Sequence, residues 1–345
     1  MIALLVGLAC APDAALPFGS TAEDCASCHV AHGDEWAASR HGQSTGSPVF
    51  QAMLPAVEDA WGGFARKTCE GCHAPGHGGD TTIGCVSCHA ADGNHAERDG
   101  KLAVDLTEPL SGPFGLGAGE AHTTIDRGFL DDSALCATCH TVTGPELLVE
   151  DTMAELAASD LADRSCVDCH LPVVGARALT PETAPRVSHD HRMVGVDPPW
   201  DTDPTDPVAA EATRALLASA LTLRVEAGEV VVTNTGGGHR VPTGVSFLRD
   251  LWVDADGIDG TTTLLRLGDQ PTHGGVDVPL LVDADAVRHG SLASGESARA
   301  TLPAATTAVH LRARAVRLDV LDALDLSALA ETLPVHEIAT VTVGN

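Results

Sequence analysis

The 345-residue chain contains no tyrosine and few other aromatic residues, with 6 Phe and 4 Trp. Aromatic residues make up only 3% of the sequence, which is little for the core of a chain of this length. The length itself favours two domains over one. We therefore expect something other than aromatic side chains to supply part of the buried apolar surface.

Basic residues are also scarce, because 20 Lys and Arg stand against 48 Asp and Glu and give a formal net charge of −28. Such an acidic chain is a poor partner for nucleic acid, whereas basic proteins or cationic surfaces suit it. Solubility alone explains the charge equally well, since net charge acts on association and not on fold.

The N-terminal apolar run Met1–Ala9 is too short to cross a bilayer and ends at Cys10. It resembles a bacterial lipoprotein signal, in which a lipidated Cys10 would tether the protein to a membrane. An ordinary secretory signal that is cleaved a little later is the alternative. Small and polar residues follow, so we assign residues 1–24 to an export signal and tether.

Against these shortages stands one motif, Cys-X-X-Cys-His, which occurs five times. The copies are Cys25-Ala-Ser-Cys28-His29, Cys69-Glu-Gly-Cys72-His73, Cys85-Val-Ser-Cys88-His89, Cys136-Ala-Thr-Cys139-His140 and Cys166-Val-Asp-Cys169-His170. This is the attachment signature of c-type haem, in which two thiols bind the porphyrin vinyl groups and the histidine binds the iron. We number the motifs 1 to 5 in chain order and predict five covalent haems.

The cysteine count supports haem over the other uses of paired cysteines. Of 11 Cys, ten belong to the motifs and only Cys10 is left, so no pair remains for a structural disulfide. Zinc prefers cysteine pairs coupled in fours and needs no histidine after every second cysteine. Five porphyrins would also supply the missing apolar surface, so we expect little regular structure up to residue 200 and a largely unfolded protein without haem.

The motifs occur in a recognisable order. Motif 1 is followed by Trp36-X-X-Ser39-X-His41, on a helix-compatible run Asp34–His41 that Gly42 would end. Two closely spaced motifs follow, then His122 before motif 4, Leu171-Pro172 after motif 5, and Ser188-His189-Asp-His191-Arg-Met193. This order resembles the multihaem cytochromes related to the nitrifier tetrahaem cytochrome. The resemblance covers roughly the first 200 residues and implies export, because these families attach haem outside the bacterial inner membrane.

Each haem iron would take one axial ligand from its own motif and needs a second from elsewhere. The region up to Trp200 holds further histidines for this purpose: His32, His41, His77, His95, His122, His189 and His191. We expect His41, His95, His122 and His191 to be distal ligands, with the fifth from His239 or His77. For His32, His77 and His189 an ordinary structural role is equally good. A methionine sixth ligand, at Met193, is a minority alternative to histidine. We therefore expect mostly bis-His haems with low potentials.

Beyond the Pro-rich linker Pro198–Pro207 no cysteine remains. Residues 208–220 suit a helix, and Leu221–Val225 and Val230–Val232 predict a hairpin around Ala227-Gly228. Alternating apolar residues recur at His310–Leu318 and Ile338–Val343. We therefore predict a mostly irregular and α-helical multihaem domain at residues 25–200 and a β-sandwich-like domain at residues 208–345.

The segment Gly238-His239-Arg-Val-Pro242-Thr243-Gly244 is similar to segments in the β-rich tails of related multihaem cytochromes. By that resemblance His239 would be a distal ligand that holds the sheet against the haem domain. A structural turn is the alternative.

The leading functional prediction is a pentahaem electron carrier of an extracytoplasmic respiratory chain, in the periplasm, in the outer membrane or at the cell surface, with other redox proteins as partners. The alternatives are an oxidoreductase that reduces a nitrogen or sulfur oxyanion at one open haem, and a haem-stacking subunit of an extracellular filament. Related nitrite reductases use Cys-X-X-Cys-Lys, and related hydroxylamine oxidoreductases use a cross-linked tyrosine. The chain has neither, which favours the carrier.

Overall fold

The computed structural model describes residues 20–92, 100–112, 117–118, 122–178, 185–196 and 207–344. The predicted signal and Cys10 lie outside these residues, as do His95 and nearly all of the predicted linker. Within the described ranges no helix is both long and apolar enough to cross a membrane.

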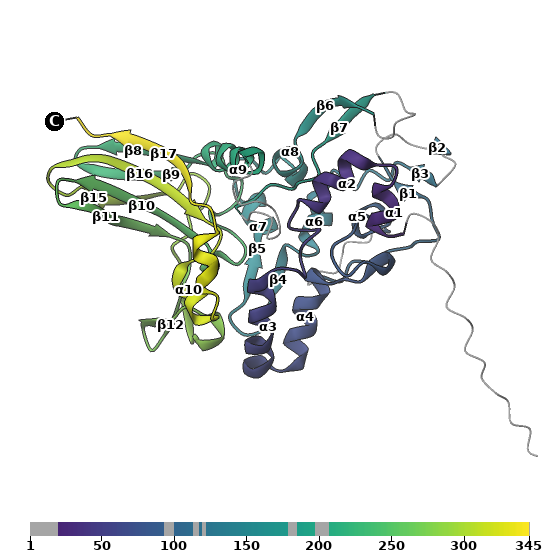
Figure 1. The fold of residues 1–345 in the computed structure, drawn as a ribbon, viewed down its shortest axis with the longest axis horizontal. Coiled ribbons are helices and arrows are strands. Elements are labelled where there is room, and N and C mark those ends of the chain that lie inside the picture. Colours follow the sequence, from purple (N-terminus) through teal and green to yellow (C-terminus); the bar gives the residue numbers. More distant parts are fainter. Residues whose placement is uncertain are drawn as a thin grey trace, which may run out of the picture.

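Residues 20–196 form short helices joined by irregular chain, on the right-hand side of Figure 1. The helices are α1 (Ala22–Ala26), α2 (Val30–Ala37), α3 (Pro48–Trp61), α4 (Gly63–His73), η1 (His77–Gly79), α5 (Cys85–His89), α6 (Ser133–Ala137), α7 (Thr152–Ala157) and α8 (Cys166–His170). The strands are β1 (Leu110–Ser111), β2 (Gly117–Ala118), β3 (Thr123–Ile125), β4 (Thr141–Thr143), β5 (Val149–Asp151), β6 (Val173–Arg177) and β7 (Arg186–His189). They pair only into small sheets, β1-β3-β2, β4-β5 and β6-β7.

Every motif lies on a helix or at its end. Helices α5 and α8 consist of motifs 3 and 5, and α4 ends in motif 2. Residues i and i+3 of a helix lie on one side, so the two thiols of a motif face the same way. Helix α8 starts at a capping box, in which Ser165 Oγ accepts from Asp168 N and Asp168 accepts from Ser165 N.

Helix α2 differs from the predicted helix Asp34–His41 at both ends. It starts at Val30, directly after motif 1, and ends at Ala37. Gly42 is not the stop, because the chain has already turned at Ser39, whose hydroxyl accepts a hydrogen bond from Gly42 N at 3.1 Å. His41 therefore lies in a turn and not on the helix.

Residues 207–344 form a β-rich region, on the left-hand side of Figure 1. Its helices are α9 (Pro207–Ala220), η2 (Ser246–Leu248), η3 (Leu281–Asp283), α10 (Leu318–Ala323) and η4 (Ser327–Glu331). Its strands are β8 (Leu221–Glu226), β9 (Glu229–Asn234), β10 (Asp250–Gly257), β11 (Gly260–Leu267), β12 (Gln270–His273), β13 (Val276–Asp277), β14 (Ala286–Arg288), β15 (Ser297–Thr301), β16 (Thr306–Arg314) and β17 (His336–Thr342). They form the sheets β11-β10-β16-β17, β15-β9-β8 and β13-β12-β14.

The predicted hairpin is confirmed, since β8 and β9 pair antiparallel. Leu221 lies opposite Asn234 at one end, and Glu226 lies opposite Glu229 at the other. Its turn residues Ala227 and Gly228 both have positive φ, as a tight primed turn requires. The predicted helix 208–220 is confirmed as α9.

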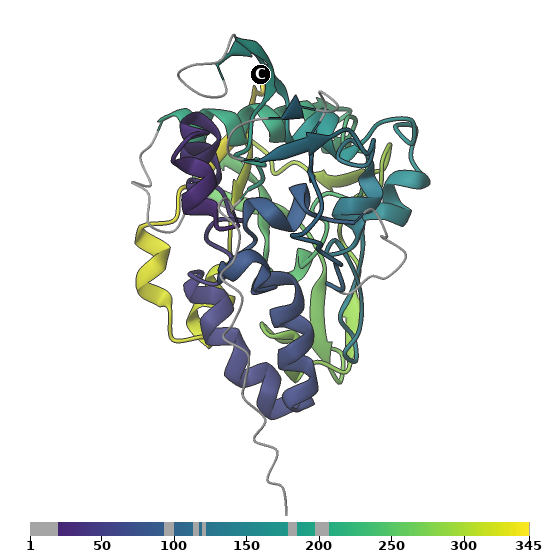
Figure 2. The same cartoon turned by 90° about the vertical axis from the view of Figure 1, so that its right-hand side faces the viewer.

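One apolar core fills the space between the four-stranded sheet and the sheet β15-β9-β8. Val230 and Val232 come from the smaller sheet, while Val253, Val309 and Leu311 come from the larger one, and all five are fully buried. A second cluster joins the two regions: Val49 and Met53 of α3 pack with Val320 and Leu321 of α10. Figure 2 shows α3 and α4 as a helical pair that extends downward beside α10.

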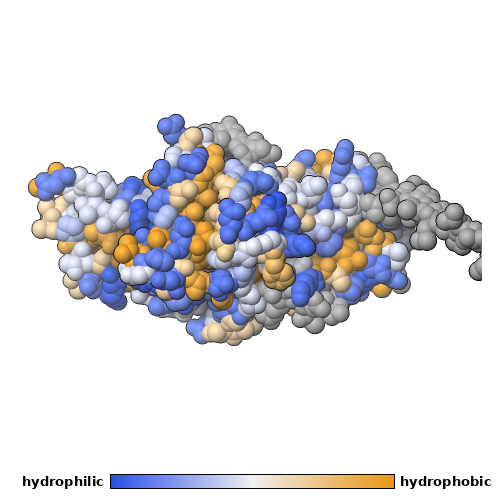
Figure 3. Space-filling model, turned by 90° about the horizontal axis from the view of Figure 1, so that it is seen from below, coloured by the Kyte–Doolittle hydropathy of each residue, from blue (hydrophilic) through white to orange (hydrophobic). Residues whose placement is uncertain are grey.

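The largest apolar cluster wholly within the described part of residues 20–196 is much smaller. It consists of Ala91, Phe129 and Leu135, with Cys88, Leu102 and Leu130 around it. On the face seen from below, apolar side chains lie in separate patches among hydrophilic ones (Figure 3). Residues 20–196 are thus held together by few apolar side-chain contacts of their own.

Candidate functional site

The five motifs gather in one cluster. The thiol of Cys25 contacts that of Cys85, which joins motifs 1 and 3. Cys72 contacts Cys139 and Cys136 contacts Cys166, which joins motif 4 to motifs 2 and 5. Cys88 of motif 3 interacts electrostatically with both cysteines of motif 4, which connects the two groups. None of the described cysteines forms a disulfide. Cofactors attached at these thiols would therefore be close neighbours.

Four motif histidines each face a histidine from another part of the chain. The ring centroids are 6.1 Å apart for His29–His122, 6.3 Å for His41–His140, 6.4 Å for His89–His191 and 6.2 Å for His170–His239. A metal–imidazole bond is about 2.0 Å long and the ring centre lies about 1.1 Å behind the nitrogen, so two imidazoles on one metal have centroids about 6.2 Å apart. The four separations therefore fit an iron atom between each pair.

Hydrogen bonds at Nδ1 fix the orientation of most of these rings. His89 Nδ1 lies 2.8 Å from Ser111 O, and His170 Nδ1 lies 2.9 Å from Val194 O. The bond from His239 Nδ1 to Arg240 O is 2.7 Å long, and His140 Nδ1 lies 3.2 Å from Glu150 Oε1. Because oxygen accepts in each case, Nδ1 carries the proton and Nε2 keeps a free lone pair for a metal.

Burial keeps several of these imidazoles neutral, as metal ligands must be. It lowers the pKa of His41 to about 3 and that of His73 to about 4. Burial likewise lowers the pKa of His89, His170 and His191.

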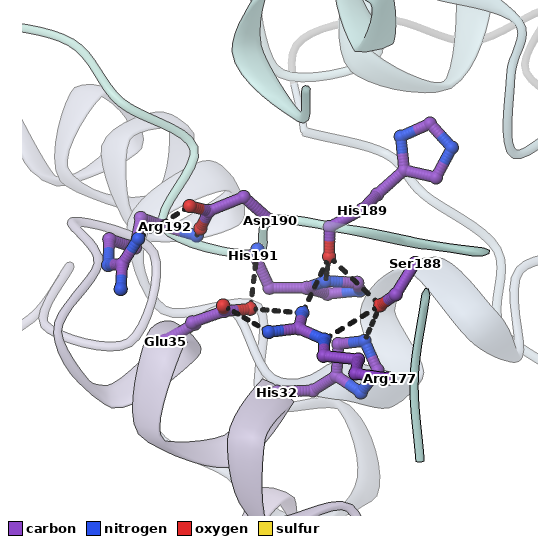
Figure 4. Close-up of polar contacts among 8 residues, drawn as sticks. All are labelled: His32, Glu35, Arg177, Ser188, His189, Asp190, His191 and Arg192. Atoms are coloured by element: carbon purple, nitrogen blue, oxygen red, sulfur yellow. Dashed lines mark hydrogen bonds and ion pairs between the residues drawn. The ribbon is translucent and has the colours of Figure 1, made fainter. Parts of the chain in front are cut away.

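The remaining histidines are engaged differently. The His32 ring centroid also lies 6.3 Å from that of His29, but His32 Nε2 contacts Ser188 Oγ at 2.8 Å, so that nitrogen is not free for a metal. His77 contacts Ser87 Oγ at 3.2 Å and faces no motif histidine among the described residues. The His189 ring points away from the neighbouring polar cluster (Figure 4). The sulfur of Met193 contacts His41 Nδ1, which places the thioether behind that ring.

Motif 2 is the exception among the five. Phe50 stacks on His73 with ring centroids 4.3 Å apart, and within the described ranges no second imidazole faces His73 at the spacing of the other four pairs. The predicted ligand His95 lies outside the described residues. Gly100 lies against motif 2, because an added Cβ there would lie 2.6 Å from the carbonyl carbon of Gly71.

His191 is held by a buried polar cluster that sequence reasoning did not find (Figure 4). Glu35 of α2 is 7% exposed and accepts two bonds from Arg177 of β6, at 2.6 and 2.8 Å. It also accepts from His191 N at 3.0 Å. Arg177 in turn donates to Ser188 Oγ at 3.0 Å and to His189 O at 2.9 Å. The cluster thus joins α2 to the hairpin β6-β7 and to the chain that carries His191.

His239 is held by a second set of contacts, from inside and outside its loop. Inside, the fully buried Asn234 donates to His239 O at 2.8 Å. Outside, Glu155 of α7 accepts from Arg240 N at 3.0 Å and from Thr243 Oγ1 at 2.7 Å. Gly238 lies so close to α7 that an added Cβ would be 2.7 Å from Leu156 Cδ1. The β-rich region thereby brings His239 to motif 5.

The sequence carried a signal for only part of the contacts that hold His191 and His239. Asn234 precedes a glycine run, a pattern typical of a turn. Glu35, Glu155 and Arg177 have no local signal, because each acts on residues that are distant in sequence.

Comparison with known proteins adds a match at the level of fold. No protein-family model matches the chain. No curated protein matches it either. Among solved structures it is similar to a penta-heme cytochrome c552 from Thermochromatium tepidum, with a TM-score of 0.62 and 18% sequence identity. The match covers 94% of this chain and 98% of that chain, so the two proteins share one fold over nearly their whole length.

Proposed function

We propose that this protein is a pentahaem c-type cytochrome that transfers electrons between other redox proteins. The observation that carries the proposal is the set of four histidine pairs, each joining one motif to a distant histidine at the separation that a shared iron requires. The fold shared with a penta-heme cytochrome supports it.

The ten motif cysteines would hold five haems covalently, and haem c supplies one-electron exchange at its iron. The chain's own residues do the rest. Motif histidines His29, His89, His140 and His170 would bind the iron on one side, with His122, His191, His41 and His239 opposite them in that order. The thiol contacts between motifs would keep the five groups close enough for electrons to pass between neighbours.

For motif 2 we propose His95 as the ligand opposite His73. His95 stands five residues before Gly100, which lies against motif 2. Five residues of chain span at most about 17 Å, so His95 is tethered within reach of that motif.

A second candidate function follows from the same motif. If His95 does not bind, the iron of motif 2 is open, and the protein reduces a nitrogen or sulfur oxyanion there. The stacking of Phe50 on His73, which no other motif histidine shares among the described residues, marks this site as the different one.

The domain and cell-level proposals rest on the sequence. We propose a pentahaem domain at residues 25–200 and a β-sandwich-like domain at residues 208–345, supported by the core shared between two sheets. We propose kinship with the nitrifier tetrahaem cytochrome superfamily, export by residues 1–24, and a location outside the cytoplasm with a membrane tether at a lipidated Cys10. The charge of −28 suits basic redox partners.

The test is the haem count. The chain is produced with the c-type maturation apparatus and measured by intact mass and by total haem per chain. We expect five haems, and four in each variant that replaces both cysteines of one motif with alanine. Cys10→Ser is the matched control and should keep five. A wild-type count below five, or a motif variant that keeps the wild-type count, would refute the proposal.

A further inference from the structure

The polar cluster around Glu35 and Arg177 places a buried ion pair beside one predicted iron ligand (Figure 4). The carboxylate of Glu35 lies 3.0 Å from the backbone nitrogen of His191. The His191 ring faces His89 of motif 3. No other paired histidine among the described residues has a carboxylate on its own backbone nitrogen.

The charges of the pair are held in place on both sides. Arg177 binds Glu35 with two parallel bonds, the strongest geometry for this pair of groups. Two parallel N–H···O bonds are the geometry of a carboxylate with a guanidinium, so Glu35 is an anion and Arg177 a cation, and together they are neutral.

We propose that the Glu35–Arg177 pair sets the reduction potential of the haem that His89 and His191 would hold. The inference rests on the proposed function, because it needs iron between these two histidines. In a poorly solvated site, a fixed charge acts strongly on a nearby redox centre. An anion favours the oxidised, more positive state and a cation favours the reduced state, so the balanced pair leaves the potential between these extremes.

This charge balance makes a prediction with a sign. Glu35→Gln keeps the shape of the side chain but leaves the guanidinium unbalanced beside His191. The potential of one haem should rise. The double variant Glu35→Gln with Arg177→Met removes both charges and should bring that potential back toward the wild-type value. Glu35→Asp and Arg177→Lys keep the charges and should move it less than Glu35→Gln does.

A purely structural role predicts a different order. In that case the double variant, which loses more contacts, would depart from wild type at least as far as Glu35→Gln alone. Asp250→Asn is the matched control, because Asp250 is another buried acid paired with arginine, Arg314, on strands β10 and β16. It should lower stability without moving the potential of any haem.

The experiment is a spectroelectrochemical titration of the haem-loaded full chain for wild type and these variants. The expected result is one raised potential in Glu35→Gln, its return in the double variant, and no shift in Asp250→Asn. A Glu35→Gln protein with unchanged or lowered potentials, or a double variant further from wild type than the single, would overturn the inference. Failure of the underlying ligation is seen separately, because His191→Ala would then leave the number of low-spin irons in the EPR spectrum the same as in wild type.

Discussion

The two regions of this molecule are stabilised in opposite ways. Residues 207–344 enclose an apolar core of their own side chains, in which Val230, Val253 and Leu311 are fully buried. Residues 20–196 have short helices, small sheets and a much smaller apolar cluster around Phe129. The difference indicates that the first region depends on cofactors for the buried surface that the second obtains from valine and leucine.

The largest test of this comparison is to withhold haem. In a full chain produced without haem attachment and kept reduced, residues 20–196 should lose their structure while the β-rich region stays folded. Limited proteolysis followed by mass spectrometry should yield one resistant fragment that covers about residues 207–344. The haem-loaded chain is the control and should resist along its length. Equal digestion of both regions would contradict the comparison.

The next test weakens the apolar core of the β-rich region, residues 207–344. Leu311→Ala removes a fully buried side chain from the core between the two sheets, and we expect a loss of about 2–5 kcal/mol in the free energy of unfolding of that region. Chemical denaturation followed by far-UV circular dichroism measures it. Leu318→Ala, at a position 47% exposed, should cost less than about 1 kcal/mol. Equal losses in the two variants would show that the core is not where stability resides.

A smaller change breaks the link between the regions. His239→Ala should remove the β-rich region's ligand from motif 5 and turn one iron per chain high-spin, while the others stay low-spin. Magnetic circular dichroism of the oxidised protein detects the change. His289→Ala, at an exposed histidine of the same region, should leave the spectrum as in wild type. If His239→Ala also leaves the spectrum unchanged, His239 is not a ligand at motif 5.

The smallest effect is expected at Glu155, which only positions the loop that carries His239. Glu155→Ala removes the acceptor for Arg240 N and Thr243 Oγ1, at a cost of about 1–3 kcal/mol. His239 should then leave the iron more often, so that cyanide binds faster at one haem. Glu155→Gln keeps an accepting oxygen and should fall between Ala and wild type. Glu211→Gln, in a surface pair on α9, is the control. Wild-type cyanide kinetics in Glu155→Ala would remove Glu155 from this role.

The sequence predicted the parts of the site that are local and missed those that are not. Cys-X-X-Cys-His is a covalent signature within five residues, so each motif could be read directly. The pairing of His29 with His122, or of His170 with His239, depends on how distant segments pack, and no spacing encodes it. The hairpin β8-β9 was predictable because its turn chemistry lies at Ala227 and Gly228. The end of α2 was not, because a side-chain contact of Ser39 decides it.

The choice among spare histidines also needed the structure. The sequence favoured His41 over His32 as a distal ligand, but no local pattern tells why, since His32 lies inside α2 and His41 four residues after its end. The structure separates them by their contacts: His32 Nε2 contacts Ser188 Oγ, and His41 faces His140. Glu35 and Arg177 could not be paired in advance, because their contact joins segments before motif 2 and after motif 5.

The central claim is that four of the five motif histidines each face a second imidazole across one iron. Low-temperature EPR of the oxidised, fully loaded protein, with the signals quantified against total haem, tests it most directly. The account predicts five low-spin irons per chain. A single high-spin iron would keep the four observed pairs and make motif 2 an open site, whereas two or more would contradict the account.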